Sequence, residues 1–418
     1  MKSSLFCILL VSLFSFACTK TETVSETYQI PIYQRSTEAE AEAGLQQKAA
    51  ENIQEFGNIY RYQDYLLVNE LGKGIHIYDN SNPQSPTQIS FMQIPGNYDL
   101  AIRNDVLFVD SYDDLLSLDI RDPNNIQLLH RKNNVFPQYH PSIGRIVGYK
   151  DTTVYYERDV DRNWPFGGSQ EDNDAVFQTT NAGGKVQNPN QTGIGGSMAR
   201  FTISGANLYT VDQNSLHSFN ISNASQIQKV GDEYVSFMAE IETIFPYQNY
   251  VFIGSTNGVF IYNVSNPAQF QYVSEFTHAR ACDPVYVSDS LAFVTLRSNT
   301  NQRCIGTNNQ LDVLNVTQIE SPTLLQTFGM TSPYGLGVSD SLIFICEGEH
   351  GVKVFDFDKI YQNRQITGIQ LNLKHHQNNL NARDVIPLKK SILVVGPNTV
   401  KQYSVDKEGK LNLISSIQ

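Results

Sequence analysis

Four acidic residues stand at corresponding places in the chain, each just before a short apolar run: Asp99, Glu242, Asp283 and Asp384. Aligned without gaps, the last three share one register and the first is one residue off. Converging carboxylates raise one another's pKa and attract cations. One hypothesis is that the group, together with the neighbouring Arg280 and Arg383, is a binding site for a cation or for a cationic or hydroxylated ligand. The alternative is that each acid pairs locally with an arginine or is simply solvated.

Other chemistry is sparse. The sequence contains no HExxH, GxSxG or CxxC motif and no phosphate-binding glycine loop. The stretch DVDRN at Asp159 opens like a calcium loop, but Trp164 and Gln170 occupy the positions that need Gly and Glu. We therefore expect no catalytic residues, no metal site and no cofactor. Paired carboxylates for glycoside cleavage stay open, because sequence spacing does not give distances between strands.

The cysteines divide into three kinds. Cys18 ends an apolar run of about a dozen residues behind Lys2, in the order Ser15-Phe16-Ala17-Cys18. This resembles a relaxed lipobox, which predicts a signal peptide over residues 1–17 and acylation of Cys18. An ordinary or uncleaved signal peptide is the alternative.

The two cysteines of one repeat, Cys282 and Cys304, form a candidate disulfide in an exported chain. Cys346 is expected to be a buried free thiol. The formal net charge of -12 argues against nucleic acid as a partner.

A repeat supplies the elements that would position these residues. The clearest copies are YLLVNELGKGIHIYDNSNP from Tyr65, VLFVDSYDDLLSLDIRDP from Val106 and YVFIGSTNGVFIYNVSNP from Tyr250. Seven copies recur, most of them about 41 to 51 residues apart, and four short strands at such a period are typical of a propeller blade. The sequence predicts an all-β propeller of about seven four-stranded blades over residues 58–418, with six or eight as alternatives.

Two segments lie outside this pattern. Residues 18–57 read as a tether, with an edge strand at residues 28–33 and a short Ala/Glu-rich helix at residues 36–53. A long insertion at about residues 137–196 separates the second and third blades, and residues 145–159 within it read as a hairpin. In a propeller, loops leading into first strands share a face with loops between second and third strands. The insertion, the acids and both candidate disulfide cysteines fall on that face.

The repeats resemble the LVIVD-repeat family of bacterial and archaeal surface propellers, over about residues 59–417. This resemblance implies a propeller on a Bacteroidetes-like cell envelope and little about chemistry. We expect a lipoprotein of the outer membrane, on its surface or periplasmic face, that binds or scaffolds an unknown protein or glycan partner without catalysis. The alternative is a polysaccharide hydrolase or lyase that uses the channel-mouth carboxylates.

Overall fold

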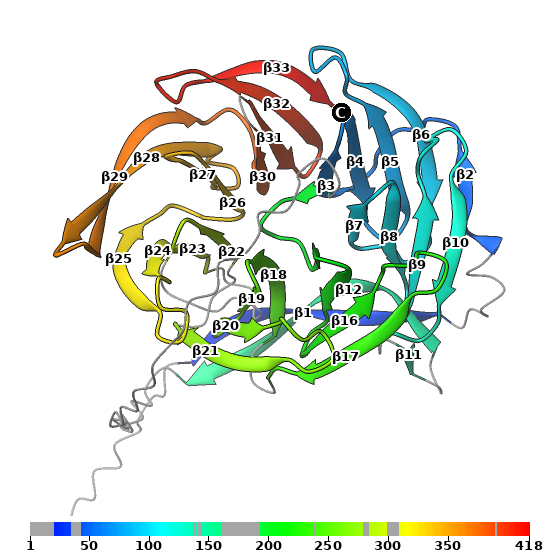
Figure 1. Cartoon of the computed structure of the whole chain (residues 1–418), viewed down its shortest axis with the longest axis horizontal. Helices are drawn as coiled ribbons and strands as arrows, with labels where there is room; N and C mark the ends of the chain where they lie inside the picture. The colour runs from blue at the N-terminus through cyan, green and yellow to red at the C-terminus, as the bar shows by residue number, and fades with distance from the viewer. Residues whose placement is uncertain are drawn as a thin grey trace, which may run out of the picture.

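Seven four-stranded antiparallel sheets form a ring around a central channel in the computed structural model (Figure 1). The structure describes residues 21–34, 43–136, 139–140, 144–159, 193–236, 240–278, 284–298, 309–388 and 391–418. In each sheet the strand order follows the chain order, from the inner strand outward. The prediction of an all-β propeller with seven four-stranded blades is confirmed.

The first four blades follow one another along the chain. Blade 1 consists of β3 (Phe56–Tyr62), β4 (Tyr65–Glu70), β5 (Gly74–Asp79) and β6 (Thr87–Gln93). Blade 2 consists of β7 (Leu100–Arg103), β8 (Val106–Ser111), β9 (Asp114–Asp119) and β10 (Gln127–Lys132). Blade 3 consists of β14 (Phe201–Ser204), β15 (Asn207–Val211), β16 (Ser215–Asn220) and β17 (Gln228–Tyr234). Blade 4 consists of β18 (Ile241–Tyr247), β19 (Tyr250–Ser255), β20 (Gly258–Asn263) and β21 (Gln271–Thr277).

Three further blades complete the ring. Blade 5 consists of β22 (Val285–Ser288), β23 (Leu291–Leu296), β24 (Gln310–Asn315) and β25 (Thr323–Gly329). Blade 6 consists of β26 (Leu336–Ser339), β27 (Leu342–Cys346), β28 (Val352–Gln362) and β29 (Gln365–Gln377). Blade 7 consists of β30 (Asp384–Pro387), β31 (Ser391–Gly396), β32 (Thr399–Val405) and β33 (Leu411–Ile417).

Five strands lie outside the seven sets of four. In blade 1, β2 (Gln46–Lys48) pairs with the outer strand β6, and β13 (Ile194–Gly195) pairs with the inner strand β3. A separate sheet pairs β1 (Thr21–Gln34) with β12 (Gly144–Asp159) and β12 with β11 (Tyr139–His140). The expected edge strand at residues 28–33 is therefore part of β1. The expected hairpin at residues 145–159 is wrong, because β12 runs through it as one strand.

Residues 36–42 of the helix expected at residues 36–53 lie outside the described residues, so the helix stays a prediction there. In the described part, Gln46–Lys48 forms β2. The open edge of β6 offers these residues backbone hydrogen bonds, whereas a short isolated helix is only marginally stable in water. The side chain of Gln47 also donates to the carbonyl of Pro123 at 2.8 Å and accepts from the amide of Ile126 at 2.8 Å.

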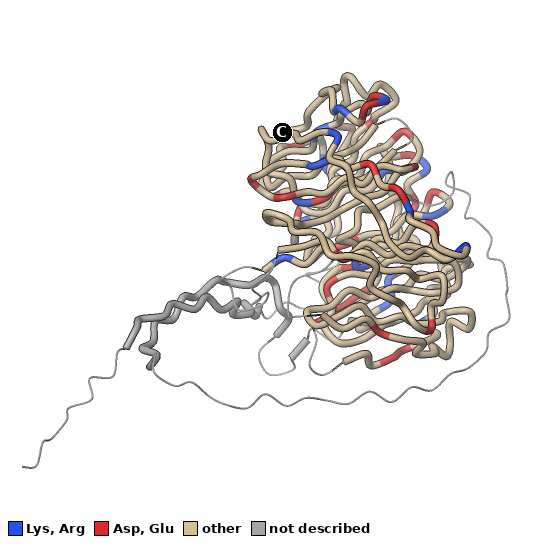
Figure 2. The backbone as a smooth tube through the Cα atoms, turned by 90° about the vertical axis from the view of Figure 1, so that its left-hand side faces the viewer, with Lys and Arg blue, Asp and Glu red and all other residues tan. Residues whose placement is uncertain are grey.

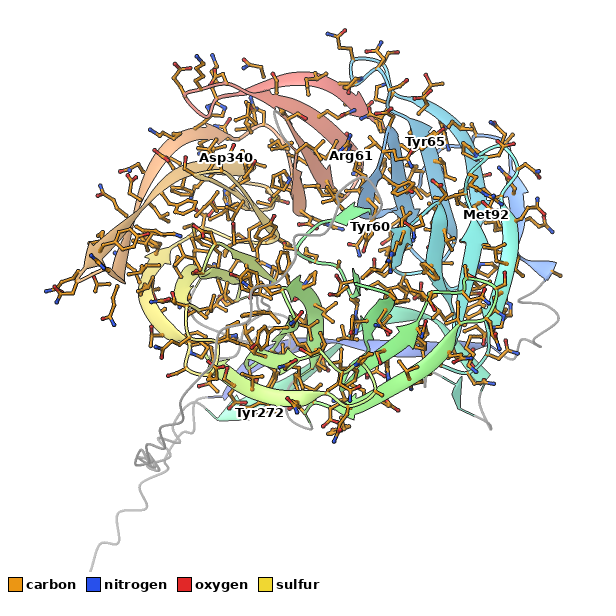
Figure 3. The ribbon with its side chains drawn as sticks, in the orientation of Figure 1. Tyr60, Arg61, Tyr65, Met92, Tyr272 and Asp340 are labelled. Carbon is orange, nitrogen blue, oxygen red and sulfur yellow. The ribbon has the colours of Figure 1, made fainter. Side chains whose placement is uncertain are left out.

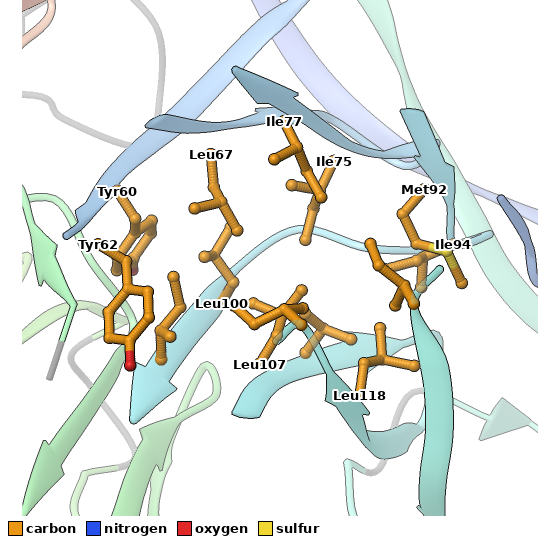
Figure 4. Packing of buried hydrophobic residues seen from close by; sticks show 14 of the residues in the cluster. Tyr60, Tyr62, Leu67, Ile75, Ile77, Met92, Ile94, Leu100, Leu107 and Leu118 are labelled. Atoms are coloured by element: carbon orange, nitrogen blue, oxygen red, sulfur yellow. The ribbon is translucent and has the colours of Figure 1, made fainter. Parts of the chain in front are cut away.

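Each of the seven interfaces between blades has its own apolar core. Alternate residues of a strand face opposite sides of its sheet, so a continuous apolar run serves two interfaces. In β8, Leu107 and Val109 pack against blade 1, whereas Phe108 packs against blade 3. Figure 4 shows the core between blades 1 and 2, where Leu67 and Ile75 meet Leu100 and Leu107. This double burial explains why the repeat strands read as unbroken hydrophobic runs.

One irregularity recurs in all seven blades. The pairing of the third with the fourth strand shifts register at the same rung of each blade, and the fourth strand carries one extra residue there. A bulge of this kind increases the local twist and bends the outer strand. Beside it, serines of the third or fourth strand reach the next blade: Ser90 donates to Pro123, and Ser218 donates to Pro267.

The ring closes without an exchange of strands, since the C-terminal residues supply all of blade 7 and none of blade 1. At this closure Asn80 and Gln402 exchange amide hydrogen bonds of 3.1 and 2.6 Å. A core that includes Phe56, Leu66 and Leu393 lies beneath them. Within the described part of the chain, no helix is long and apolar enough to cross a membrane.

Candidate functional site

The segment of residues 193–201, which we call the channel segment, crosses the inside of the ring before it enters blade 3. Its first residue donates a backbone hydrogen bond of 2.8 Å from Gly193 to Ile102 of blade 2. β13 then pairs with β3 of blade 1, where Gly195 stands opposite Tyr60. Ser197 accepts at its hydroxyl the amide hydrogen of Leu336 in blade 6, at 2.9 Å. The segment therefore touches blades 1, 2 and 6, and Figure 1 shows β13 inside the ring beside β3.

Two glycines let the channel segment come this close. A Cβ atom on Gly195 would lie 2.5 Å from Cε1 of Tyr60. A Cβ atom on Gly196 would lie 1.8 Å from Oδ2 of Asp384. Real Cβ contacts are never that short, so both positions need a residue without a side chain. Close packing thus explains why glycines stand in the GIGGS stretch, residues 193–197, at this end of the insertion.

Asp99 binds the C-terminal half of the channel segment. Its Oδ2 accepts backbone hydrogen bonds from Arg200 and, at 3.0 Å, from Phe201. Its Oδ1 accepts from the hydroxyl of Tyr60 at 2.7 Å and from the amide of Asn58 at 3.1 Å. Only 2% of Asp99 is exposed, and this burial raises the pKa of its carboxyl in spite of the hydrogen bonds. Its two oxygens are therefore occupied by the protein itself.

Asp384 binds the middle of the same segment from blade 7. Its Oδ1 accepts from the Ser197 hydroxyl at 3.2 Å and from the Val385 amide at 2.9 Å. The backbone amides of Ser197 and Met198 add further hydrogen bonds. Burial raises the pKa of Asp384 to about 7, and these hydrogen bonds oppose the rise. Like Asp99, Asp384 holds the channel segment in place.

A third acid, Asp110, stands behind Asp99 at the end of β8. Its Oδ1 accepts from the amides of Tyr98 and Asp99, at 2.8 and 3.0 Å, and from the side chain of Asn97 at 2.7 Å. Burial raises its pKa to about 7. Tyr60 lies near all three acids, and its pKa is raised well above the usual value, first by burial and then by the charge of Asp99. Figure 3 labels Tyr60 at the inner side of blade 1.

The remaining residues predicted for the channel mouth are placed differently. Glu242 is half-buried at the start of β18, next to a register shift between Ile241 and Thr243, whereas Asp384 pairs regularly with Val395. The two acids therefore lie on different rungs: Glu242 lies between the pairs that Gly254 and Ser255 make, whereas Asp384 is opposite Val395, the residue before Gly396. Arg383 is exposed just before β30. Arg280, Asp283, Cys282, Cys304 and Cys18 lie outside the described residues.

Sequence reasoning missed the partners that occupy these acids. Ser197, Tyr60, Asn97 and Asp110 belong to no motif that the sequence displays. The GIGGS stretch was the one available signal, since a glycine run can mark close backbone approach. The expected free thiol at Cys346 is confirmed: the side chain is buried, and burial raises its pKa well above the usual value.

The acidic residue next to Cys346 also has a structural role. Glu347 is fully buried, pairs with Lys353 at 2.6 Å and accepts the amide hydrogen of Thr331 at 2.8 Å. Glu70 does the same in blade 1, where it pairs with Lys73 at 2.6 Å and His76 at 2.8 Å. In the described residues no group of three or more His, Cys, Asp or Glu side chains is placed to hold a metal ion. Figure 2 shows basic and acidic residues interspersed along the blades.

The comparisons with known proteins agree with the fold. The chain is similar to the periplasmic gluconolactonase PpgL of Pseudomonas aeruginosa, with 11% identity over 87% of this chain and 96% of that chain and a TM-score of 0.55. It is also similar to the computationally designed Ika8 protein, with 9% identity over 88% and 89% of the two chains and a TM-score of 0.51.

A third similarity, to BamB from Moraxella catarrhalis, has 7% identity over 93% and 97% of the two chains and a TM-score of 0.45. No protein-family model matches the chain, and no curated protein matches it. At these identities the two structures with TM-scores above 0.5 support the β-propeller fold alone.

Proposed function

We propose that the chain is a lipid-anchored cell-envelope protein of the LVIVD-repeat kind that binds a protein or glycan partner without catalysis. One observation carries the non-enzymatic part of this proposal. The two carboxylates that a hydrolase would need at the channel mouth, Asp99 and Asp384, are buried and accept hydrogen bonds from the channel segment. A general acid or base must reach the substrate within hydrogen-bond distance. These two carboxylates instead stabilise the inside of a rigid ring.

The loop-rich face is the part of the molecule we propose for binding. It carries exposed Arg383 and the aromatic ring of Tyr334, over which the guanidinium of Arg297 lies 4.0 Å from the ring centroid. Loops held on a rigid scaffold are common recognition surfaces. The partner we favour is a glycan or a protein with acidic and hydroxyl groups, because arginine and tyrosine can bind both.

Binding and catalysis can be tested on the same samples. The full chain would be applied to a glycan array, and polysaccharides that bind would then be assayed for released reducing ends. We expect binding without release. The Arg383→Glu variant should lose at least tenfold in affinity, whereas Lys407→Glu, an exposed cation in the opposite turn of the same blade, should bind like the parent. Release of reducing ends that Asp99→Asn abolishes would overturn the proposal in favour of a hydrolase.

The anchor needs its own test. If Cys18 is acylated, the Cys18→Ser variant should move from the membrane fraction to the soluble fraction and lose label from an alkyne fatty acid. A Cys346→Ser variant is the matched control and should keep both the membrane location and the label. Equal labelling of the Cys18→Ser variant and the parent chain would exclude acylation at this residue.

A further inference from the structure

The hairpin of blade 6 is larger than its counterparts. Its outer strand β29 has 13 residues, whereas the outer strands of the other six blades have six or seven. The strand before it, β28, has 11 residues. The ion pair of Lys359 with Asp289 of blade 5, at 2.6 Å, fastens the hairpin to its neighbour. The long hairpin is therefore held in place and presents a long edge.

One face of this hairpin is mostly apolar, with Lys359 opposite Ile369 as its charged residue. Phe355 stands opposite Leu373 and Phe357 opposite Leu371, and the middle of the face packs against blade 5. Both ends of the face extend beyond that core, because Leu373 is 56% exposed and Tyr361 is 60% exposed. Large exposed apolar side chains at the end of a buried face indicate a surface that another chain can cover.

The outer edge of β29 has no strand paired to it among the described residues. A long, exposed edge with free backbone donors and acceptors is a template for strand pairing. Blade 1 shows that an outer edge in this ring accepts a strand, since β2 pairs there with β6. The register shifts beside residues 367 and 374 leave Gly368 to Leu373 as the regular part of the β29 edge.

The regular part of the β29 edge is complementary to itself. In an antiparallel pair centred on Leu371, Ile369 of one chain would stand opposite Leu373 of the other. No charged residue lies between Gln365 and Leu373, so no like charges would face each other. We propose that a second copy of this chain pairs with β29 in this register and joins two blades into one eight-stranded sheet. Such a contact is two-fold symmetric and closes on a dimer.

The oligomeric state of the full chain tests this proposal. Sedimentation equilibrium in density-matched detergent would be run from about 1 to 100 µM, so that micelles do not contribute to the mass. We expect the parent chain to be dimeric at the upper end of this range. In the Leu373→Lys variant the apparent dissociation constant should rise at least tenfold, because a lysine would have to lie against the apolar Ile369 of the second copy.

A matched control variant tests whether the dimer forms through the edge of β29 or through the outer edge of another blade. Leu413→Lys changes a residue with 58% exposure at the corresponding rung of β33 in blade 7, and it should leave the dimer intact. A parent chain that stays monomeric at 100 µM would overturn the proposal. So would a dimer that Leu413→Lys, rather than Leu373→Lys, dissociates. Neither result bears on glycan binding, which is proposed for the loop-rich face and not for the outer edge of blade 6.

Discussion

The hydroxyl of Ser197 donates a hydrogen bond of 3.2 Å to the carboxylate of Asp384, although the two residues lie 187 positions apart in the chain. Ser197 belongs to the insertion between blades 2 and 3, and Asp384 opens the last blade. The contact joins the middle of the chain to its end inside the channel. It also occupies one of the carboxylates that would otherwise be the best candidate for chemistry.

Because Gly196 packs closely against Asp384, adding one methyl group at residue 196 is predicted to lower the stability of the protein. We expect Gly196→Ala to lower the free energy of unfolding by about 1–3 kcal/mol, because the added Cβ must displace the carboxylate or the channel segment. Chemical denaturation would measure the change. Gly329→Ala is the control, since a Cβ there meets no atom within 4 Å. Equal stability of the two variants would contradict the packing described here.

The raised pKa of Asp110 predicts a pH dependence of stability. Its pKa in the folded protein, about 7, lies above the usual 3.8, so the folded state binds more protons between these values. Stability should therefore fall as the pH rises from about 4 to 7, by up to about 1.4 kcal/mol per pH unit for one group. Asp110→Asn keeps the Oδ1 acceptor and should flatten this slope.

The control for this titration is Asp79→Asn. Hydrogen bonds from Ser81 lower the pKa of the half-buried Asp79 carboxyl, so its titration falls below the range of interest. Denaturation curves between pH 5 and 8 should show the parental slope for Asp79→Asn and a weaker slope for Asp110→Asn. A parental slope in both variants would mean that Asp110 is ionised in the folded protein throughout this range.

The side-chain amides of Asn80 and Gln402 hydrogen-bond to each other across the ring closure, which predicts an energetic coupling between these two residues. Each single alanine substitution should cost about 1–3 kcal/mol, because the other buried amide is left without its partner. The double variant should cost less than the sum of the two, by about 1 kcal/mol or more. Additive costs in a double-mutant cycle would show that the pair contributes nothing to closure.

The buried thiol of Cys346 should be unreactive toward alkylating reagents. Because the thiolate is the reactive form and burial raises the pKa, we expect no modification by iodoacetamide in the folded protein over several hours. Mass spectrometry of the peptide that contains Cys346 would report complete modification after denaturation. Rapid labelling of this residue under native conditions would show that blades 6 and 7 separate readily, since Cys346 belongs to their shared core.

The repeat strands were predictable because each needs two apolar faces, as Leu107 and Phe108 illustrate. The environment of Asp99 was not predictable, because its partners Tyr60 and Arg200 come from segments far away in the sequence. The gapless alignment puts Glu242 and Asp384 in one register, but they lie on different rungs because strand pairing, which the alignment does not contain, differs between the two hairpins. Residues 46–48 became a strand because an open edge, which composition does not report, was beside them.

Among the described residues, blades 1 and 7 exchange no strand, so no backbone ladder and no chain connection crosses the seam between them there. Side chains hold this seam from the outside, and the channel segment bridges it from the inside by pairing with Tyr60 on one flank and binding Asp384 on the other. Residues from the middle of the chain thus hold blades 1 and 7 together. Hydrogen exchange should accordingly begin at this seam, and a cut in the middle of the chain should loosen its two ends.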